Sequence, residues 1–196
     1  LEIPLIIKNI AIISSASAAG YEDFMNQLNK NNFNYKFNLE LFEANMQGQQ
    51  TEKTVISAFD RIFQTIEKFD IVCIIRGGGS ETDLAAFDNY NIAFYVTQFP
   101  LPVITGIGHE RDETVTDIVA NTRLKTPTAA AEFIINNNAA FEADINGLAN
   151  SISEKVRDYL YINKLIITNA SVRISKLRKF ISDKTENCND YFYRLR

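Results

Sequence analysis

Blocks of apolar and mixed residues alternate along the chain and predict strands and helices in turn. Short runs that are apolar throughout are typical of buried strands, and apolar residues every three or four positions are typical of helices. The strongest strand signal is 70–76 (DIVCIIR), which runs directly into Gly77-Gly78-Gly79. We expect strands over 5–14, 35–42, 70–76 and 102–107, and helices over 21–30, 51–69 and 83–99.

This alternation predicts an α/β fold, a mainly parallel sheet flanked by helices. Because the strands of a parallel sheet share one direction, the loops at their carboxyl ends lie along one edge of the sheet. Ligands bind at that edge in open α/β sheets. The expected strands place three loops there, 14–23, 76–83 and 106–117.

The pattern changes after Pro127, where no further proline and only one glycine, Gly147, occur. Apolar residues recur every three or four positions as far as Ile181, with Asn163 interrupting the stripe. This spacing predicts a long helix or a helical hairpin of coiled-coil character. We therefore expect an α/β domain over 1–130 and a helical segment over 131–196.

The formal net charge of −4 conceals an asymmetry, since residues 1–150 carry −9 and residues 151–196 carry +5. The basic segment suggests an anionic partner, with a solvated helix face as the alternative. No run approaches the length of a membrane span and no signal-peptide pattern begins the chain, so we expect a cytoplasmic protein without membrane contact. Cys73 and Cys188 lie in different contexts and are expected to be reduced thiols.

The loop RGGGSETD is a candidate phosphate site. Gly77–Gly79 allow a tight turn whose N–H groups point outward, and the helix that follows adds a positive end. Ser80 can cap that helix, with Asp83 three residues later. Arg76 can pair with phosphate through two parallel hydrogen bonds. The alternative is a capped helix after a glycine turn, with Arg76 in a salt bridge.

The loop GIGHERD holds His109, the only histidine of the chain. A histidine can give or take a proton near neutral pH, and a neighbouring acid fixes its tautomer. Asp112 could orient His109 or hold a divalent cation. The alternative is a histidine that caps the helix beginning near Asp112. Zinc is not expected, because no second histidine is present and the cysteines are distant.

The first loop, SSASAAGYEDF over 14–24, has small residues that leave room for a substrate. Glu22 and Asp23 stand at the start of the helix that follows. Acids at that position also interact favourably with the helix dipole, which is the alternative explanation.

The segments RGGGSETDLAAFDN and PVITGIGHERDETVTDIVANTRLKTPTAAAE, with their spacing, resemble the exodeoxyribonuclease VII large subunit family, over about residues 10–132. The resemblance implies an N-terminal OB-fold, a catalytic α/β domain and a coiled-coil region that recruits several small subunits. We expect this chain to lack the OB-fold and to hold the catalytic domain and the start of the helical region.

The resemblance also implies hydrolysis of single-stranded DNA to oligonucleotides, with catalytic positions at Asp23, Arg76, His109 and Asp112. Mg2+ is permitted by it rather than required, and we assign no metal ligand. The first loop departs from the family, whose pattern there is T-S-P-T-G-A-A, because SSASAAG lacks the proline and has its glycine displaced. The alternative function is a sugar-phosphate- or nucleotide-binding domain without nuclease activity.

Overall fold

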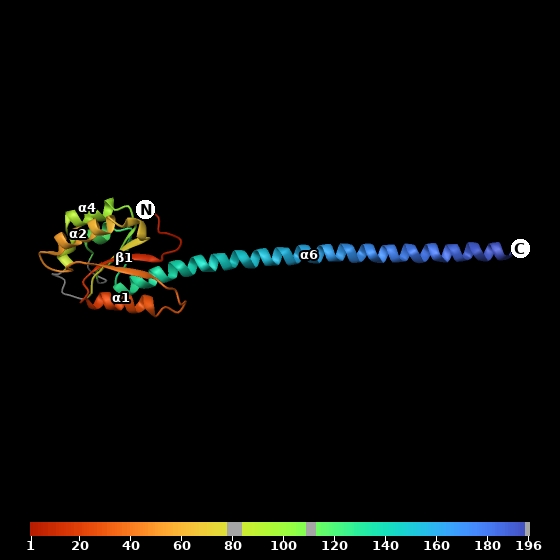
Figure 1. Cartoon of the computed structure of the whole chain (residues 1–196), viewed down its shortest axis with the longest axis horizontal. Helices are drawn as coiled ribbons and strands as arrows, with labels where there is room; N and C mark the ends of the chain where they lie inside the picture. Colours follow the sequence, from red (N-terminus) through yellow and green to blue (C-terminus); the bar gives the residue numbers. More distant parts are fainter. Residues whose placement is uncertain (78–83, 109–112, 195–196) are drawn as a thin grey trace. The chain divides into compact units, whose positions relative to one another are not determined.

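A single parallel sheet organises the α/β part of the protein. The computed structural model describes residues 1–77, 84–108 and 113–194 (Figure 1). The sheet within them has the strand order β2-β1-β3-β4-β5, and all neighbouring strands are parallel. The strands are β1 (Asn9–Ser14), β2 (Asn38–Glu43), β3 (Ile71–Ile75), β4 (Val103–Gly106) and β5 (Thr122–Arg123). The predicted fold class is confirmed.

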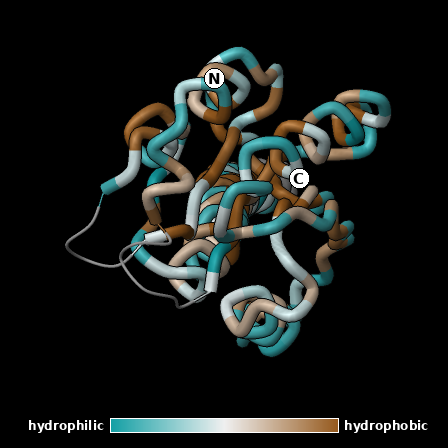
Figure 2. The backbone as a smooth tube through the Cα atoms, turned by 90° about the vertical axis from the view of Figure 1, so that its left-hand side faces the viewer, coloured by the Kyte–Doolittle hydropathy of each residue, from teal (hydrophilic) through white to brown (hydrophobic). Residues whose placement is uncertain are grey.

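Helices cover both faces of this sheet. The helical elements are α1 (Ala19–Asn29), α2 (Thr51–Phe63), η1 (Ile66–Lys68), η2 (Ala85–Phe87), α4 (Tyr90–Gln98), α5 (Val115–Val119) and α6 (Pro127–Arg194). Two apolar clusters fill the layers, one from the sheet with α2 and α4, the other from the sheet with α1 and the start of α6. Figure 1 shows α1 and α2 on opposite sides of β1, and Figure 2 shows the hydrophobic segments running through the interior.

The first strand begins at Asn9 rather than at Leu5 as predicted, because side chains form hydrogen bonds with the backbone N–H and C=O groups just before it. Asp70 accepts hydrogen bonds from the N–H groups of Lys8 (2.8 Å) and Asn9 (2.7 Å). Asn138 of α6 bonds to both backbone groups of Ile7, at 2.8 Å each. Of the predicted strand residues before β1, Ile7 is fully buried, whereas Leu5 and Ile6 are 70% and 54% exposed.

The single helix predicted over 83–99 is wrong for the part that the structure describes. Residues 85–87 form a short 3-10 turn, and α4 starts anew at Tyr90. Asn89 separates the two, because its side-chain oxygen accepts hydrogen bonds from the N–H groups of Asn91 (2.8 Å) and Ile92 (3.1 Å). This is the N-cap geometry that asparagine favours.

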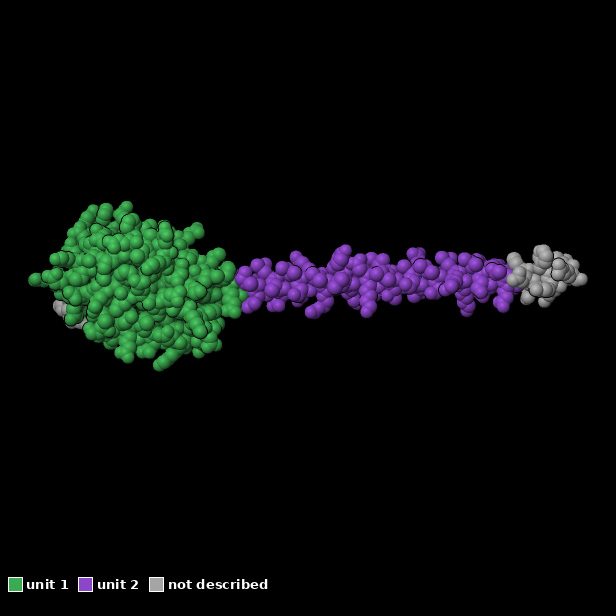
Figure 3. Space-filling model, in the orientation of Figure 1, with its two compact units in different colours: residues 1–143 green, residues 144–196 purple. Residues whose placement is uncertain are grey.

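The region after Pro127 is one helix, so the hairpin alternative is wrong. Asn163 stays inside it, with its side-chain amide donating to the carbonyl oxygen of Tyr159 at 2.8 Å. The chain divides into two compact units, 1–143 and 144–196 (Figure 3). The first turns of α6 belong to the α/β unit, because Ala130, Ala131 and Ile134 are fully buried there. None of the described helices is long and apolar enough to cross a membrane.

The burial of Ile134 yields a prediction about where α6 contributes to stability. Replacing a fully buried isoleucine by alanine removes apolar contacts and leaves a cavity, so Ile134→Ala should lower the free energy of unfolding by about 2–5 kcal/mol. Ile152→Ala, at a residue of the same helix that is 63% exposed, should change it by less than about 0.5 kcal/mol. Denaturant titration of both variants measures the difference, and equal effects would contradict the core assignment.

Candidate active site

The strand order creates a switch point between β1 and β3. The chain leaves β1 toward β2 on one side and later returns to β3 on the other, so the loops after β1 and β3 diverge and leave a crevice. The two strands are tied where they end, because the Ser14 hydroxyl donates to the carbonyl oxygen of Ile75 at 2.7 Å. In doubly wound sheets this is the place where ligands bind.

A cavity of about 460 Å³ lies at this switch point. That volume is within the range of small-ligand sites, roughly 300–1,000 Å³. Three loops line it, and all follow carboxyl ends of strands. The lining residues are Ser15, Ser17, Ala18 and Ala19 after β1, Asn45, Met46 and Gln47 after β2, and Arg76 and Gly77 after β3.

Two glycines bring the walls of the cavity together. A Cβ atom on Gly20 would lie 2.6 Å from the backbone nitrogen of Gly77 and 2.8 Å from the carbonyl oxygen of Arg76. A Cβ atom on Gly77 would in turn lie 3.1 Å from the Cα atom of Gly20. No side chain fits between these backbones, so the first turn of α1 packs directly on the loop after β3.

The start of α1 presents backbone to the cavity. Its N-cap residue is Ala18, which makes no side-chain capping bond. Ala18 and Ala19 both line the cavity and are too small to cover the first turn. The N–H groups of a helix start carry partial positive charge and favour an anion.

Arg76 adds a cation to the same crevice. The residue is only 3% exposed and lines the cavity beside Gly77. Its backbone N–H donates to the carbonyl oxygen of Gly106 at 3.2 Å, which links the loop after β3 to the end of β4. A guanidinium in a mostly buried position binds carboxylate or phosphate groups well, because its donors form a planar fork.

The candidate residues of the two motifs are only partly within the described structure. Gly78, Gly79 and Ser80 of the glycine motif, and His109 and Asp112 of the histidine motif, lie outside the described residues. The segments from which they extend start side by side, because Ile75 and Gly106 are partners in the register of β3 and β4. Their roles stay predictions.

Asp23 is described, and it does not line the cavity. It is exposed on α1, one turn beyond the residues that do. The described parts of the chain contain no group of three or more His, Cys, Asp or Glu side chains that could hold a metal ion.

A glycine at position 106 is explained by packing within the fold rather than by ligand binding. A Cβ atom there would lie 3.2 Å from the Thr126 carbonyl oxygen and 3.3 Å from the Ala130 Cβ atom. The glycine lets the first turn of α6 pack on β4. Asp117, another acid of this region, is 2% exposed and forms a capping box with Thr114 at the start of α5.

The loop after β2 was missed by sequence reasoning. The rule that placed three loops at the carboxyl edge applies equally to the strand predicted over 35–42. In the structure β2 extends to Glu43, and the residues after it, Ala44–Gln47, carry neither glycine nor charge that would mark them as candidates. The position of β2 beside β1 is the information that places them at the cavity.

Fold and cavity together define a doubly wound α/β domain with an anion-attracting crevice at its switch point. The family model for the large subunit of exonuclease VII matches residues 1–196, and the chain belongs to that family. It is 32% identical to the exodeoxyribonuclease 7 large subunit of Clostridium botulinum (strain Hall), over 94% of this chain and 49% of the relative. It is 38% identical to the protein of the same name from Lactobacillus johnsonii, over 69% of this chain and 29% of the relative. The chain thus spans about half the length of the first of these relatives.

The contact of Gly20 with Gly77 can be tested by adding one methyl group. Gly20→Ala and Gly77→Ala should each lower the free energy of unfolding by about 1–3 kcal/mol, because backbone must move to admit the methyl group. Gly147→Ala is the matched control, since nothing lies within 4 Å of its Cβ position in α6. There alanine should stabilise the helix by about 0.5–1 kcal/mol. Thermal and denaturant unfolding measure the three changes, and destabilisation by Gly147→Ala alone would refute the explanation.

Proposed function

We propose that the protein containing this chain hydrolyses phosphodiester bonds of single-stranded DNA to oligonucleotides, as an exodeoxyribonuclease VII large subunit. The observation that carries the proposal is the switch-point cavity, where buried Arg76 and the uncapped start of α1 meet. Both groups attract a phosphate. Membership in the family favours the nuclease over the alternative, a sugar-phosphate- or nucleotide-binding domain without nuclease activity.

Phosphate binding is assigned to the loop after β3. Arg76 donates to the phosphoryl oxygens and stabilises the charge that develops on them. The N–H groups of Gly77–Gly79 and the hydroxyl of Ser80 complete the assigned phosphate site. The support for this role is the placement of Arg76 and Gly77 in the cavity wall.

Proton transfer is assigned to the histidine motif. His109 acts as general base toward the attacking water or as general acid toward the leaving oxygen, and Asp112 orients it. Asp23 is proposed to assist in activating water. The support for combining the two motifs is the hydrogen bond that joins Arg76 to Gly106, just before the histidine loop.

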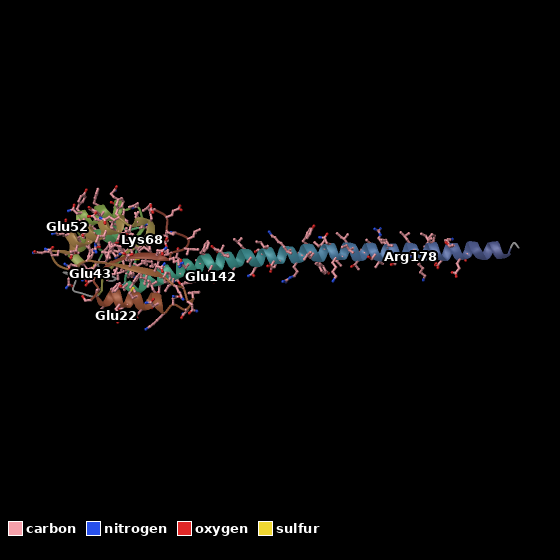
Figure 4. The ribbon with its side chains drawn as sticks, in the orientation of Figure 1. Glu22, Glu43, Glu52, Lys68, Glu142 and Arg178 are labelled. Atoms are coloured by element: carbon pink, nitrogen blue, oxygen red, sulfur yellow. The ribbon has the colours of Figure 1, made fainter. Side chains whose placement is uncertain are left out.

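The charge of the chain bears on DNA binding. Residues 1–150 carry a net charge of −9, and DNA affinity comes largely from cationic contacts with phosphates. The basic residues of 151–196, such as Arg178 (Figure 4), are proposed to contribute those contacts, together with an OB-fold in the complete protein. We propose a cytoplasmic location for this activity.

Activity measurements on the complete protein test the catalytic assignment. Arg76→Ala and His109→Ala should each lower kcat/KM for single-stranded DNA by roughly 10²–10³-fold, because each removes a group that acts in the transition state. Arg76→Lys should recover only part of the loss, since lysine keeps the charge without the fork. Lys68→Ala, at an exposed cation of η1, is the control and should leave activity unchanged.

Near wild-type activity in both alanine variants, with an unchanged melting temperature, would overturn the assignment. If only Arg76→Ala unfolds, the His109→Ala result still decides the question for the histidine.

The helix α6 supplies the proposed partner surface. Beyond the α/β unit its apolar residues are exposed, with Leu148 61%, Ile152 63% and Val156 52% accessible. Their three- and four-residue spacing forms a stripe of the kind that packs against another helix. We assign this stripe to the exodeoxyribonuclease VII small subunits, several of which bind one large subunit in this proposal.

A pair of matched substitutions tests this surface. Ile152→Asp places a carboxylate in the stripe and should weaken small-subunit binding at least about tenfold. Asn150→Asp adds the same charge two residues away, on the opposite side of the helix, and should leave binding unchanged. Titration calorimetry of the complete protein with its small subunit measures both affinities. Equal losses would show that charge alone, rather than the stripe, is responsible.

A further inference from the structure

The cavity has a second wall that the phosphate chemistry does not use. It is formed by Asn45, Met46 and Gln47, which follow β2. Since β2 lies on the other side of β1 from β3, this wall lies across β1 from Arg76. The proposed nuclease mechanism assigns none of these three residues a role.

The backbone of this wall is held firmly. The N–H of Ala44 donates to the carbonyl oxygen of Ser14 at 2.9 Å, and the N–H of Asn45 donates to the Thr54 hydroxyl of α2 at 3.0 Å. Met46 is 6% exposed and packs in the cluster between the sheet and α2. The loop is therefore anchored on both sides of Asn45, and its side chains project from a rigid support.

The two amide side chains of the wall have no hydrogen-bond partner among the residues that the structure describes. Asn45 and Gln47 are exposed, flank the buried Met46 and line the cavity. Neither side chain makes a hydrogen bond with the described part of the chain. Elsewhere in the fold, the side chains of Asn31, Asn89 and Asn138 bond to backbone groups. Two amides are thus presented to the cavity with their donors and acceptors available.

The two sides of the cavity differ in chemistry. Arg76 and the start of α1 offer only donors and positive charge, which suit a phosphate. Each amide of the β2 side offers both donors and an acceptor, and carries no charge. The edges of nucleobases show the same mixture of donors and acceptors, and asparagine and glutamine pair with them. Met46, which lies between them and is largely buried, also lines the cavity.

We propose that the cavity is a nucleotide subsite in which Asn45 and Gln47 bind the base. The phosphate of the same nucleotide lies at Arg76 and the start of α1. The inference rests on the function proposed above, because that function supplies DNA as the substrate. Its consequence is that the cleavage rate depends on the base that adjoins the scissile phosphate, and that this dependence comes from the loop after β2.

The test compares two double variants of the complete protein with its small subunit. Asn45→Ala/Gln47→Ala removes both amides and keeps Met46 and the anchored backbone. Asn29→Ala/Gln64→Ala is the matched control, because these residues are exposed at the ends of α1 and α2, away from the cavity. The substrates are single-stranded oligonucleotides that differ in one base beside a single cleavable phosphodiester, the others being phosphorothioates.

The expected result is a KM about tenfold higher in the cavity variant, with kcat within about threefold of wild type. The differences among the four bases that wild type shows should disappear in the cavity variant and persist in the control. An unchanged KM and an unchanged base preference in the cavity variant would overturn the proposal.

A second measurement separates this inference from the proposed nuclease function. If the wild-type complex cleaves no DNA, the function fails, and the subsite is tested by calorimetry with dAMP, dCMP, dGMP and TMP. Binding that the cavity variant weakens about tenfold, and the control does not, supports the subsite. Base recognition is refuted if wild type, cavity variant and control bind the nucleotides equally. It is also refuted if the cavity variant loses affinity for inorganic phosphate to the same extent as for the nucleotides.

Discussion

The close approach of two backbones, at Gly20 and Gly77, is the constraint on which the site depends. It seats the first turn of α1 on the loop that follows β3, with no side chain between them. The positive end of a helix and the guanidinium of Arg76 are thereby held at one crevice. A larger residue at either glycine would separate these groups, and the proposed phosphate site needs them together.

The same contact concentrates positive potential in a part of the chain that is acidic overall. The N–H groups at the start of α1 carry partial positive charge, and Arg76, which is only 3% exposed, lines the same crevice. An anion in the crevice can accept hydrogen bonds from the helix N–H groups and from a guanidinium, which is the basis of the proposed phosphate site.

Much of the fold could be predicted from the sequence because its strands and helices carry strong local patterns. The run 70–76 and its glycines predicted β3 and the turn after it, and the carboxyl-edge rule placed Arg76 at a ligand site. The pairing of Gly20 with Gly77 could not be predicted, because it joins residues far apart in sequence. The helix start at Asn89 was not predicted, because the amphipathic pattern runs through it without a break. The strand β5 was not predicted, because two residues are too few to show a strand pattern.

The sequence marked the cavity-lining loops after β1 and β3, through small residues in the first and through glycine and charge in the second. Asn45 and Gln47 carry no such mark, and their place at the cavity follows from β2 lying next to β1. Asp23 is exposed on α1 and does not line the cavity, and its role stays a prediction. Topology thus places residues at the cavity that charge and glycine alone do not mark.

The helix α6 joins two kinds of surface in one element. At its start, small residues let it lie against β4, where Gly106 faces Ala130, and Ile134 fills the core. Over residues 144–187 the same helical spacing continues, and the large apolar residues there are exposed. A long helix of this kind gains most of its stability from packing an apolar face. The start of α6 obtains that packing from the sheet, whereas the exposed stripe is the surface for which we propose a partner.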